Sequence, residues 1–322
     1  MIAKLKKLKS ATKRLGASAV RPLFLDLGGD HRDAIFVAGT ERSGTTWLAD
    51  LVNYQNSFRL IFEPFWSNRV PECSAFSAQQ YLRENDSSPE FLDPARKILE
   101  GSVRNPWFDK FHRAFVTRRR VVKDVRANLL LKWLNVQFPH MPIVLIIRHP
   151  CAVASSQKQA NHRFGNLQDH FLSQAALVDD FLGPYLEFVK TLETPFEERV
   201  FRWCVQNYVP LKQFDPDSVH VVFYEELCVR PAETLESLFS YLELPLDVDK
   251  VDLLAPSPVS RPDSAVVTGE SLIDKWRDFI SQQEVDRAIE ILKIFGLDTV
   301  YDQESMPHSA RIREFMSAGA DQ

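Results

Sequence analysis

Short, wholly apolar segments alternate with helix-forming segments along this chain, and this alternation constrains the fold more than any other feature. The strongest apolar segment, residues 143–147, has the sequence Ile-Val-Leu-Ile-Ile, and residues 34–38, 59–62 and 219–223 form similar segments. Residues 120–125 are a fifth candidate strand. Short strands that are apolar on both faces are typical of a parallel sheet covered by helices on each side. The sequence therefore predicts an α/β fold with a central parallel sheet between two layers of helices.

Helix signals occupy the stretches between these segments. The clearest set lies at residues 87–101, where Ser87 or Ser88 is the expected N-cap, Pro89 suits the first turn, Glu90 can complete a capping box and Gly101 ends the helix. The predicted helices span residues 44–55, 88–101, 128–138, 150–156, 194–212, 231–242 and 281–296.

Composition limits the class of protein. The chain has 322 residues, of which 45% are hydrophobic and 25% charged, values that exclude a disordered, collagen-like or coiled-coil protein. No apolar run reaches the roughly 18–20 residues that cross a bilayer, so no membrane span is expected. The four cysteines are far apart and form no C-x-x-C pair. This spacing predicts free thiols, with neither a zinc site nor a disulfide framework, in a reducing compartment, the cytoplasm.

Charge is distributed unevenly. Residues 1–21 hold seven basic side chains and no acidic one, whereas the rest of the chain holds 32 basic and 43 acidic side chains, a balance near −11. Leucines at helical spacing make residues 1–30 a candidate basic amphipathic arm, either in peripheral contact with an anionic membrane or acidic partner, or simply a solvated terminus. The lysines interrupt any apolar core of a signal peptide. So acidic a body argues against binding nucleic acid.

The densest chemistry lies between the first predicted strand and the first predicted helix. Gly39 and Gly44 are spaced as in a Walker A loop (G-x-x-x-x-G), in which backbone N–H groups and the helix N-terminus attract phosphate. The next two residues are Thr45 and Thr46, so the Walker lysine is missing, and the cation of the loop is Arg42. A glycine-containing turn that binds nothing is the alternative to a phosphate loop.

Two segments of the chain resemble the sulfotransferases that use 3′-phosphoadenosine-5′-phosphosulfate (PAPS). The segment 40–48, Thr-Glu-Arg-Ser-Gly-Thr-Thr-Trp-Leu, is similar to their 5′-phosphosulfate loop, and 146–156 is similar to the strand, loop and helix that hold the 3′-phosphate. Weaker similarity extends over most of residues 34–300. The resemblance implies a P-loop-type fold and PAPS as sulfuryl donor, with 3′,5′-bisphosphoadenosine (PAP) as product and no metal.

The resemblance also implies the nucleotide-binding residues. In the 5′ loop these are Arg42, Ser43, Gly44, Thr45, Thr46 and Trp47, and in the second segment they are Arg148 and Ser156. A guanidinium at Arg148 suits a phosphate dianion, with a surface ion pair as the alternative. Trp47 is expected either against adenine or in the core of the first helix. His149 departs from the aspartate or asparagine that the family usually has there, but this position is not the phosphate ligand.

The expected catalytic residues are Arg42, which stabilises the leaving phosphate, and Glu63 as general base. Small-molecule sulfotransferases use a histidine in a Lys-Thr-His pattern, but Lys123-Asp124-Val125 lacks it. The carbohydrate branch uses a glutamate before proline, which Glu63-Pro64 resembles, and Arg42 in place of lysine also favours that branch. Apolar neighbours should raise the pKa of Glu63; a pairing with an arginine is the alternative. Lys123 is expected either to touch the sulfate or to be an ordinary strand-end lysine.

The acceptor is expected to meet residues 65–120. Seven basic side chains and one acidic one lie in 101–123 among four aromatic residues, which suits an acidic or glycan acceptor, or else a solvated basic face. The prediction is therefore a sulfotransferase domain over 31–300 with a C-terminal tail over 301–322, acting on a hydroxyl of a saccharide or glycolipid. The alternatives are a P-loop kinase, against which the missing lysine and the lack of a clear strand-terminal Mg²⁺ aspartate argue, and an inactive nucleotide-binding protein.

Overall fold

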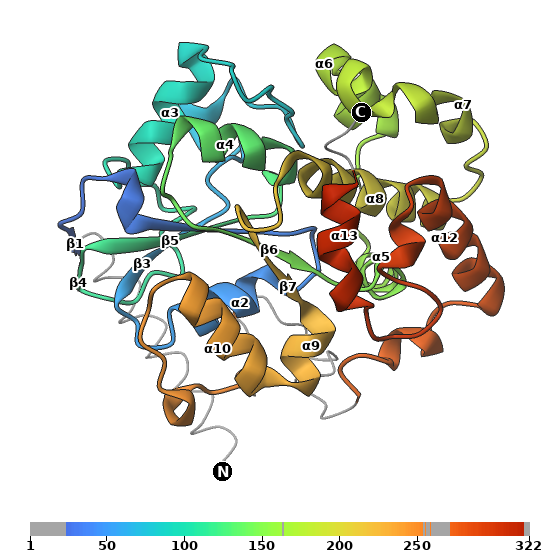
Figure 1. The fold of residues 1–322 in the computed structure, drawn as a ribbon. Coiled ribbons are helices and arrows are strands. Elements are labelled where there is room, and N and C mark those ends of the chain that lie inside the picture. The colour runs from blue at the N-terminus through green and yellow to red at the C-terminus, as the bar shows by residue number, and fades with distance from the viewer. Residues whose placement is uncertain (1–23, 163, 254, 256–257, 259–270, 319–322) are drawn as a thin grey trace, which may run out of the picture.

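A five-stranded parallel sheet forms the centre of the molecule (Figure 1). The structure is a computed structural model that describes residues 24–162, 164–253, 255, 258 and 271–318. The strand order is β3-β5-β2-β6-β7, and every neighbouring pair is parallel. The five strands are β2 (Ala34–Ala38), β3 (Phe58–Phe62), β5 (Arg119–Asp124), β6 (Ile143–Ile147) and β7 (His220–Phe223). All five lie within a residue or so of the predicted strands, so the α/β prediction is confirmed.

Helices cover both faces of this sheet, because successive side chains of each strand point to opposite sides. The helices are α2 (Thr45–Val52), α3 (Pro89–Leu99), α4 (Leu131–Gln137), α5 (Pro150–Gln159), α6 (Ala175–Leu177), α7 (Leu186–Val189), α8 (Pro195–Gln213), α9 (Tyr224–Val229), α10 (Pro231–Tyr241), α12 (Gln282–Ile294) and α13 (Ile312–Ser317). Along β2, the side chain of Phe36 packs on one face of the sheet, in the larger core with α3, α4 and α8. Ile35 and Val37 pack on the other face, in the core with α2 and α10.

The caps of the predicted helices are partly as expected. Ser281 and Glu284 form the complete capping box of α12. Ser88 is the N-cap residue of α3, as predicted, but its side chain makes no capping hydrogen bond, so the expected capping box with Glu90 does not form. Asp86 instead accepts a hydrogen bond from the Ser88 backbone N–H at 2.8 Å, so the turn before the helix is stabilised one step earlier.

A buried ionic cluster, which no local pattern predicts, fixes the segment 101–109 beside β3. The fully buried Arg59 donates to Asp109 at 2.9 Å and to the carbonyl oxygens of Gly101 and Val103 at 2.8 and 2.6 Å. Asp26, in the short strand β1 (Leu25–Asp26), pairs with Arg59 at 3.0 Å. β1 pairs with β4 (Val116–Thr117) to form a separate two-stranded sheet. The cluster orients the aromatic segment toward the carboxyl end of β3.

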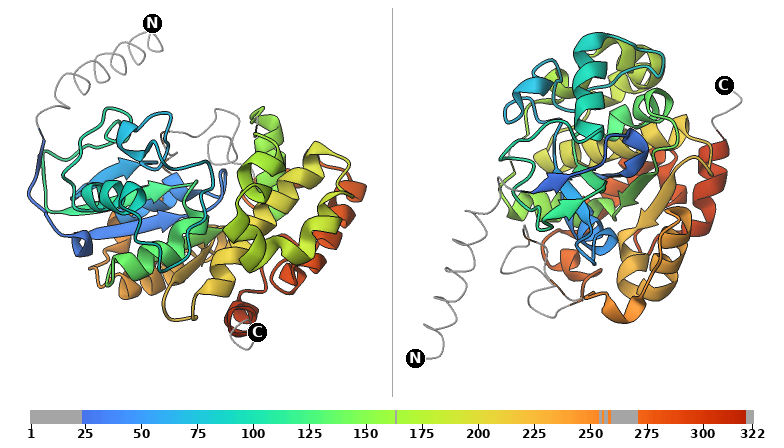
Figure 2. Two further views of the ribbon diagram at one scale, coloured as in Figure 1. Left: turned by 90° about the horizontal axis from the view of Figure 1, so that it is seen from above. Right: turned by 90° about the vertical axis from the view of Figure 1, so that its left-hand side faces the viewer.

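The C-terminal residues pack into the same core. Figures 1 and 2 show α12 and α13 (red) beside α8 (yellow), and Tyr301, Phe315 and Met316 are buried in the larger core cluster. The division into an arm, a domain and a tail at residues 30 and 300 stays a prediction; residues 1–23 of the arm lie outside the described residues. Within the described residues, no helix is long and apolar enough to cross a membrane.

Candidate functional site

The loop between β2 and α2 has the backbone of a phosphate-binding turn. Gly44 has φ of 91°, and a Cβ there would lie 2.7 Å from the ring of Tyr224, so glycine is required. Arg42 also has a positive φ, 77°, which is strained for a residue with a side chain. The first turn of α2 carries no acidic side chain. The N–H groups that begin this helix therefore keep their positive potential for an anion.

The structure brings the two predicted phosphate elements into direct contact. The Arg42 Nε–H donates to Ser156 Oγ at 3.0 Å, and Arg148 Nη1 donates to the backbone oxygen of Arg42 at 3.1 Å. These residues are more than a hundred positions apart in sequence. They meet because β2 and β6 are parallel neighbours, so the loops after both strands lie at the same edge of the sheet.

Donors at this edge suit a nucleotide with two phosphate groups. The Arg148 guanidinium lies 4.2 Å from the ring centroid of Tyr224, and its buried Nε has no hydrogen-bond partner among the described residues. The buried Nε1 of Trp47 likewise lacks a partner in the described part of the chain, and its ring meets Tyr224 edge-on at 5.6 Å. Ser43, Thr45 and Thr46 are buried in the loop or the first turn of α2. The donor set therefore fits the predicted bisphosphate ligand, and Trp47 packs against Tyr224, the ring beside Arg148.

His149 has a structural task in this second element. Its Nδ1 accepts the Cys151 N–H at 3.2 Å and caps α5, its Nε2 contacts the backbone oxygen of Asp302 at 3.0 Å, and its ring stacks on Trp276 with centroids 4.8 Å apart. Complete burial lowers the pKa of His149 to about 4, so the imidazole is neutral at pH 7. This departure from the family pattern therefore fixes the loop of Arg148 without adding charge to it.

Glu63 lies at the carboxyl end of β3, as predicted, but it is held by two cations. Lys123 Nζ lies 2.7 Å from Glu63 Oε1, and Arg126 Nη1 lies 2.8 Å from Oε2. The Glu63 backbone N–H also donates to the oxygen of Lys123 at 2.6 Å, and φ of Glu63 is 49°. Of the two alternatives for this carboxylate, the structure contains the ion-paired one.

The expected direction of the pKa shift was therefore wrong. Burial does raise the pKa of Glu63, but the positive charges of Lys123 and Arg126 and their hydrogen bonds outweigh burial and hold the pKa below its usual range. The apolar neighbours predicted from sequence are present, since Ile61, Phe62 and Phe65 are buried. The sequence could not show that two cations, Lys123 from β5 and Arg126 from the loop after it, also face the carboxylate.

Two residues of this candidate site, Arg126 and Asp124, were not predicted from the sequence. Arg126 bridges Glu63 and Glu41, with a 3.3 Å contact to Glu41, and therefore connects the general-base candidate to the phosphate loop. Asp124 is fully buried and accepts backbone N–H groups of Phe65 at 2.9 Å and Arg126 at 2.7 Å. Burial, and then the charge of Glu63, raise the pKa of Asp124 to about 6. The signal available in the sequence was the polar pair Lys123-Asp124 at the end of a buried strand. Ligands of α/β sheets bind at the carboxyl ends of strands, so polar residues there are candidates for a site.

Asp124 also corrects one argument against a kinase. It ends β5, beside Ala38 of the phosphate-loop strand, so a strand-terminal aspartate does exist. Both of its oxygens accept backbone N–H groups, and the carboxylate therefore holds two loops together. Across the described residues, no group of three or more histidine, cysteine, aspartate or glutamate side chains is placed to hold a metal ion.

The histidines closest in sequence to these segments lie away from Glu63 or are otherwise engaged. His112 is buried edge-on against Phe24, and its ring centroid is 4.2 Å from that ring. His162 lies 3.5 Å from Glu41. His149 is stacked on Trp276, and in the described part of the chain none of the three histidines forms a hydrogen bond or ion pair with Glu63.

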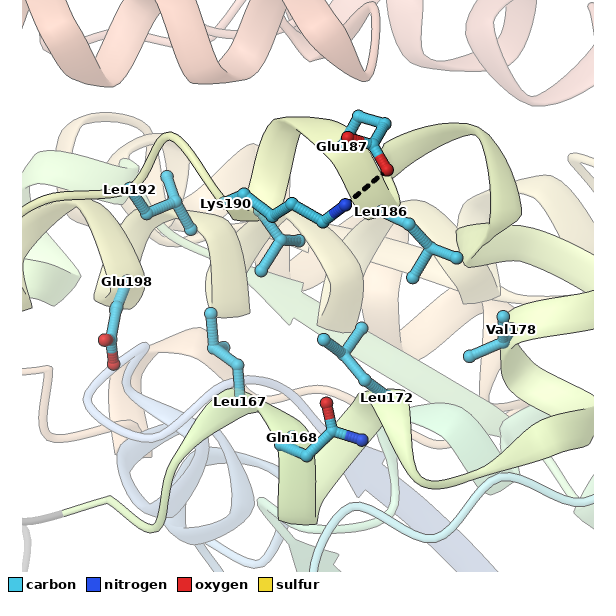
Figure 3. A pocket seen from close by; sticks show the side chains of 10 residues that line it. Leu167, Gln168, Leu172, Val178, Leu186, Glu187, Lys190, Leu192 and Glu198 are labelled. Atoms are coloured by element: carbon cyan, nitrogen blue, oxygen red, sulfur yellow. Dashed lines mark hydrogen bonds and ion pairs between the residues drawn. The ribbon is translucent and has the colours of Figure 1, made fainter.

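A separate cavity lies in the segment between α5 and α8 (Figure 3). Its volume is about 590 Å³, and Leu167, Leu172 and Leu186 point into it (Figure 3). None of its lining residues belongs to the phosphate loop, to the contacts of Glu63 or to the Arg148 element. The chemistry of the site therefore does not depend on this cavity.

Comparison with known proteins gives one family. A family model described as "Sulfotransferase family" matches residues 34–248. None of the curated proteins compared with this chain matches it.

Solved structures that resemble the chain include the sulfotransferase domain from the curacin biosynthetic pathway (18% identity, 83% of this chain and 98% of that one, TM-score 0.45). A second is the sulfotransferase domain of the Synechococcus PCC 7002 olefin synthase (15% identity, 84% of this chain and 95% of that one, TM-score 0.46). A third is mouse sulfotransferase SULT7A1 complexed with PAP (13% identity, 94% of this chain and 92% of that one, TM-score 0.43).

Proposed function

The chain belongs to the sulfotransferase family, and from this premise we propose that the site described above moves a sulfuryl group from PAPS to a hydroxyl of a saccharide or glycolipid. The observation that carries the proposal is the contact between the two phosphate elements, Arg42 with Ser156 and Arg148 with Arg42. A single adenosine with one phosphate at the 3′ position and one at the 5′ position of its ribose would place a phosphate in each of the two elements at once.

Different residues would bind the 3′-phosphate, the 5′-phosphosulfate and the adenine of the ligand. Arg148 and Ser156 would hold the 3′-phosphate, with the unpartnered Nε of Arg148 available for it. Ser43, Gly44, Thr45 and Thr46 would hold the 5′-phosphosulfate through backbone N–H groups and hydroxyls. Trp47 would lie against the adenine. PAPS supplies an activated sulfuryl group when bound.

Arg42 and Glu63 would do the chemistry. Arg42 places a fixed positive charge beside the loop, where negative charge develops on the leaving phosphate. Glu63 would take the proton of the acceptor hydroxyl. Because Lys123 and Arg126 lower its pKa, the carboxylate is ionised at neutral pH and able to accept a proton, although it is a weaker base than an unpaired one.

A nucleotide-binding experiment tests the donor. PAP should raise the melting temperature of the protein more than ATP with Mg²⁺ does, because PAP has a phosphate for each element. Arg148→Ala should abolish most of this preference, whereas the matched control Arg118→Ala, at an exposed arginine, should keep it. Equal stabilisation by ATP with Mg²⁺ would favour a kinase.

A transfer experiment tests the acceptor. The protein is incubated with PAPS carrying ³⁵S and with a panel of glycans, glycolipids and small alcohols. Label should appear in saccharide-containing acceptors. Binding of PAP without transfer to any acceptor would favour the inactive alternative, and transfer only to non-sugar alcohols would refute the saccharide assignment.

A further inference from the structure

Aromatic rings and cations lie around Glu63. Trp107 is anchored there, because its Nε1–H donates to the backbone oxygen of Glu63 at 3.2 Å. The ring of Trp66 meets that of Trp107 edge-on, with centroids 4.9 Å apart. The buried Arg59 cluster fixes the segment that carries Trp107. The group is therefore built into the fold and does not depend on a free loop.

The faces of these rings hold cations. Lys110 Nζ lies 3.3 Å from the centroid of Trp107 and 4.0 Å from that of Phe62. The guanidinium of Arg69 lies 5.3 Å from the centroid of Trp107 and 5.5 Å from that of Trp66. Arg126 lies 4.0 Å from the centroid of Trp66. Because cations already lie over the faces of these rings, those faces are not free to stack against the apolar face of a neutral sugar.

Among the described residues, two of these cations have no ion-pair partner. Arg126 and Lys123 pair with Glu63, whereas the side chains of Arg69 and Lys110 form no hydrogen bond or ion pair within the described part of the chain and contact only the aromatic rings. Partial burial, opposed by Glu63 and reinforced by Lys123, Arg69 and Arg126, lowers the pKa of Lys110 to about 8. An anion placed here would replace the water that the ammonium has lost.

We propose that the acceptor carries an anionic group near the hydroxyl that is sulfated, and that Arg69 and Lys110 bind this group over the ring of Trp107. The proposal rests on the proposed function, since the cations flank Glu63, the candidate base. Carboxylate, phosphate and sulfate ester share the required chemistry of a hydrogen-bond-accepting anion. The anionic group would orient the acceptor so that its hydroxyl faces Glu63.

Matched acceptors test this inference. Glucose is compared with glucuronate, glucose 6-phosphate and glucose 6-sulfate in the transfer assay with labelled PAPS, and the best anionic member identifies the source of the charge. We expect kcat/KM for that member to exceed the glucose value by about 10- to 100-fold, the usual effect of a charge-assisted contact. Arg69→Gln and Lys110→Met should each remove most of this difference. Arg118→Gln, which loses the same charge at an exposed site, should not.

A binding measurement separates this inference from the proposed function. The intrinsic tryptophan fluorescence of the full-length protein, to which Trp66 and Trp107 contribute, is titrated with the same four sugars in the presence of saturating PAP, and again without PAP. If PAP does not bind, the proposed function fails, yet tighter binding of an anionic sugar that Lys110→Met abolishes would still support the anion site. If PAP binds and transfer occurs equally well to glucose and to every anionic analogue, the anion site is refuted while sulfuryl transfer stands.

Discussion

Replacement of Glu63 by glutamine tests the candidate base. The substitution keeps the size of the side chain and one oxygen acceptor, but the amide cannot take the proton of a hydroxyl. We expect kcat to fall by about 10²–10⁴-fold, the usual loss when a general base is removed. Nucleotide affinity should remain near wild type, because the contacts among Arg42, Ser156 and Arg148 do not include Glu63.

The same substitution has a cost in stability that can be estimated from the ion pairs. The Lys123 side chain is only 3% exposed, and its Nζ lies 2.7 Å from Glu63. Removing one partner of a buried ion pair costs about 3–5 kcal/mol. We expect the lower end, about 3 kcal/mol, because the glutamine oxygen still accepts a hydrogen bond and Arg126 keeps its contact with Glu41.

Two measurements separate the two effects. Urea denaturation gives the free energy of unfolding, and initial rates with labelled PAPS give kcat. The double variant Glu63→Gln with Lys123→Met removes the orphaned ammonium, so it should regain most of the lost stability without regaining turnover. Asp217→Asn is the control, because its exposed pair with Arg313 should contribute less than about 1 kcal/mol. Near-normal kcat in Glu63→Gln would refute the assignment of the base.

Four further predictions concern Arg42, Lys123, His149 and the basic N-terminal arm. Arg42→Ala should lower kcat by about 10²–10³-fold and also weaken PAP binding measured by calorimetry; unchanged PAP affinity would count against its place in the loop. Lys123→Met should move the acidic limb of the kcat/KM profile to higher pH, because it removes a charge that holds the pKa of Glu63 low; a limb that stays in place would separate that pKa from catalysis. In the folded protein the pKa of His149 is about 4 instead of 6.5, so its contribution to stability falls as pH falls from about 6.5 to about 4. His149→Asn should flatten this slope in urea titrations, and an unchanged slope would assign it to other groups. Deletion of residues 1–21 should abolish salt-sensitive binding to anionic vesicles while turnover of a soluble acceptor continues; loss of that turnover would place the arm in the active site.

Local patterns determined the framework of the site. Four short apolar segments, together with a fifth candidate strand at residues 120–125, predicted the parallel sheet, because a strand buried on both faces has no polar side to alternate with. The spacing of Gly39 and Gly44 predicted the turn between β2 and α2, where Gly44 does adopt a left-handed backbone. The second phosphate element, residues 146–156, was predicted from its resemblance to a segment of sulfotransferases. In each case the signal itself lies within about ten consecutive residues, so it can be found in the sequence.

The tertiary structure alone decided what surrounds Glu63. Lys123 lies 60 positions further along the chain, and it faces Glu63 because β3 and β5 are paired with Phe62 opposite Lys123. The sign of the pKa shift depends on that register, since burial alone raises the pKa of a carboxylate whereas two adjacent cations lower it. The same holds for Arg69 and Lys110, which reach the ring of Trp107 from separate loops. Sequence specifies which charges are present, but electrostatic energies depend on distance and burial, and only the folded chain sets these.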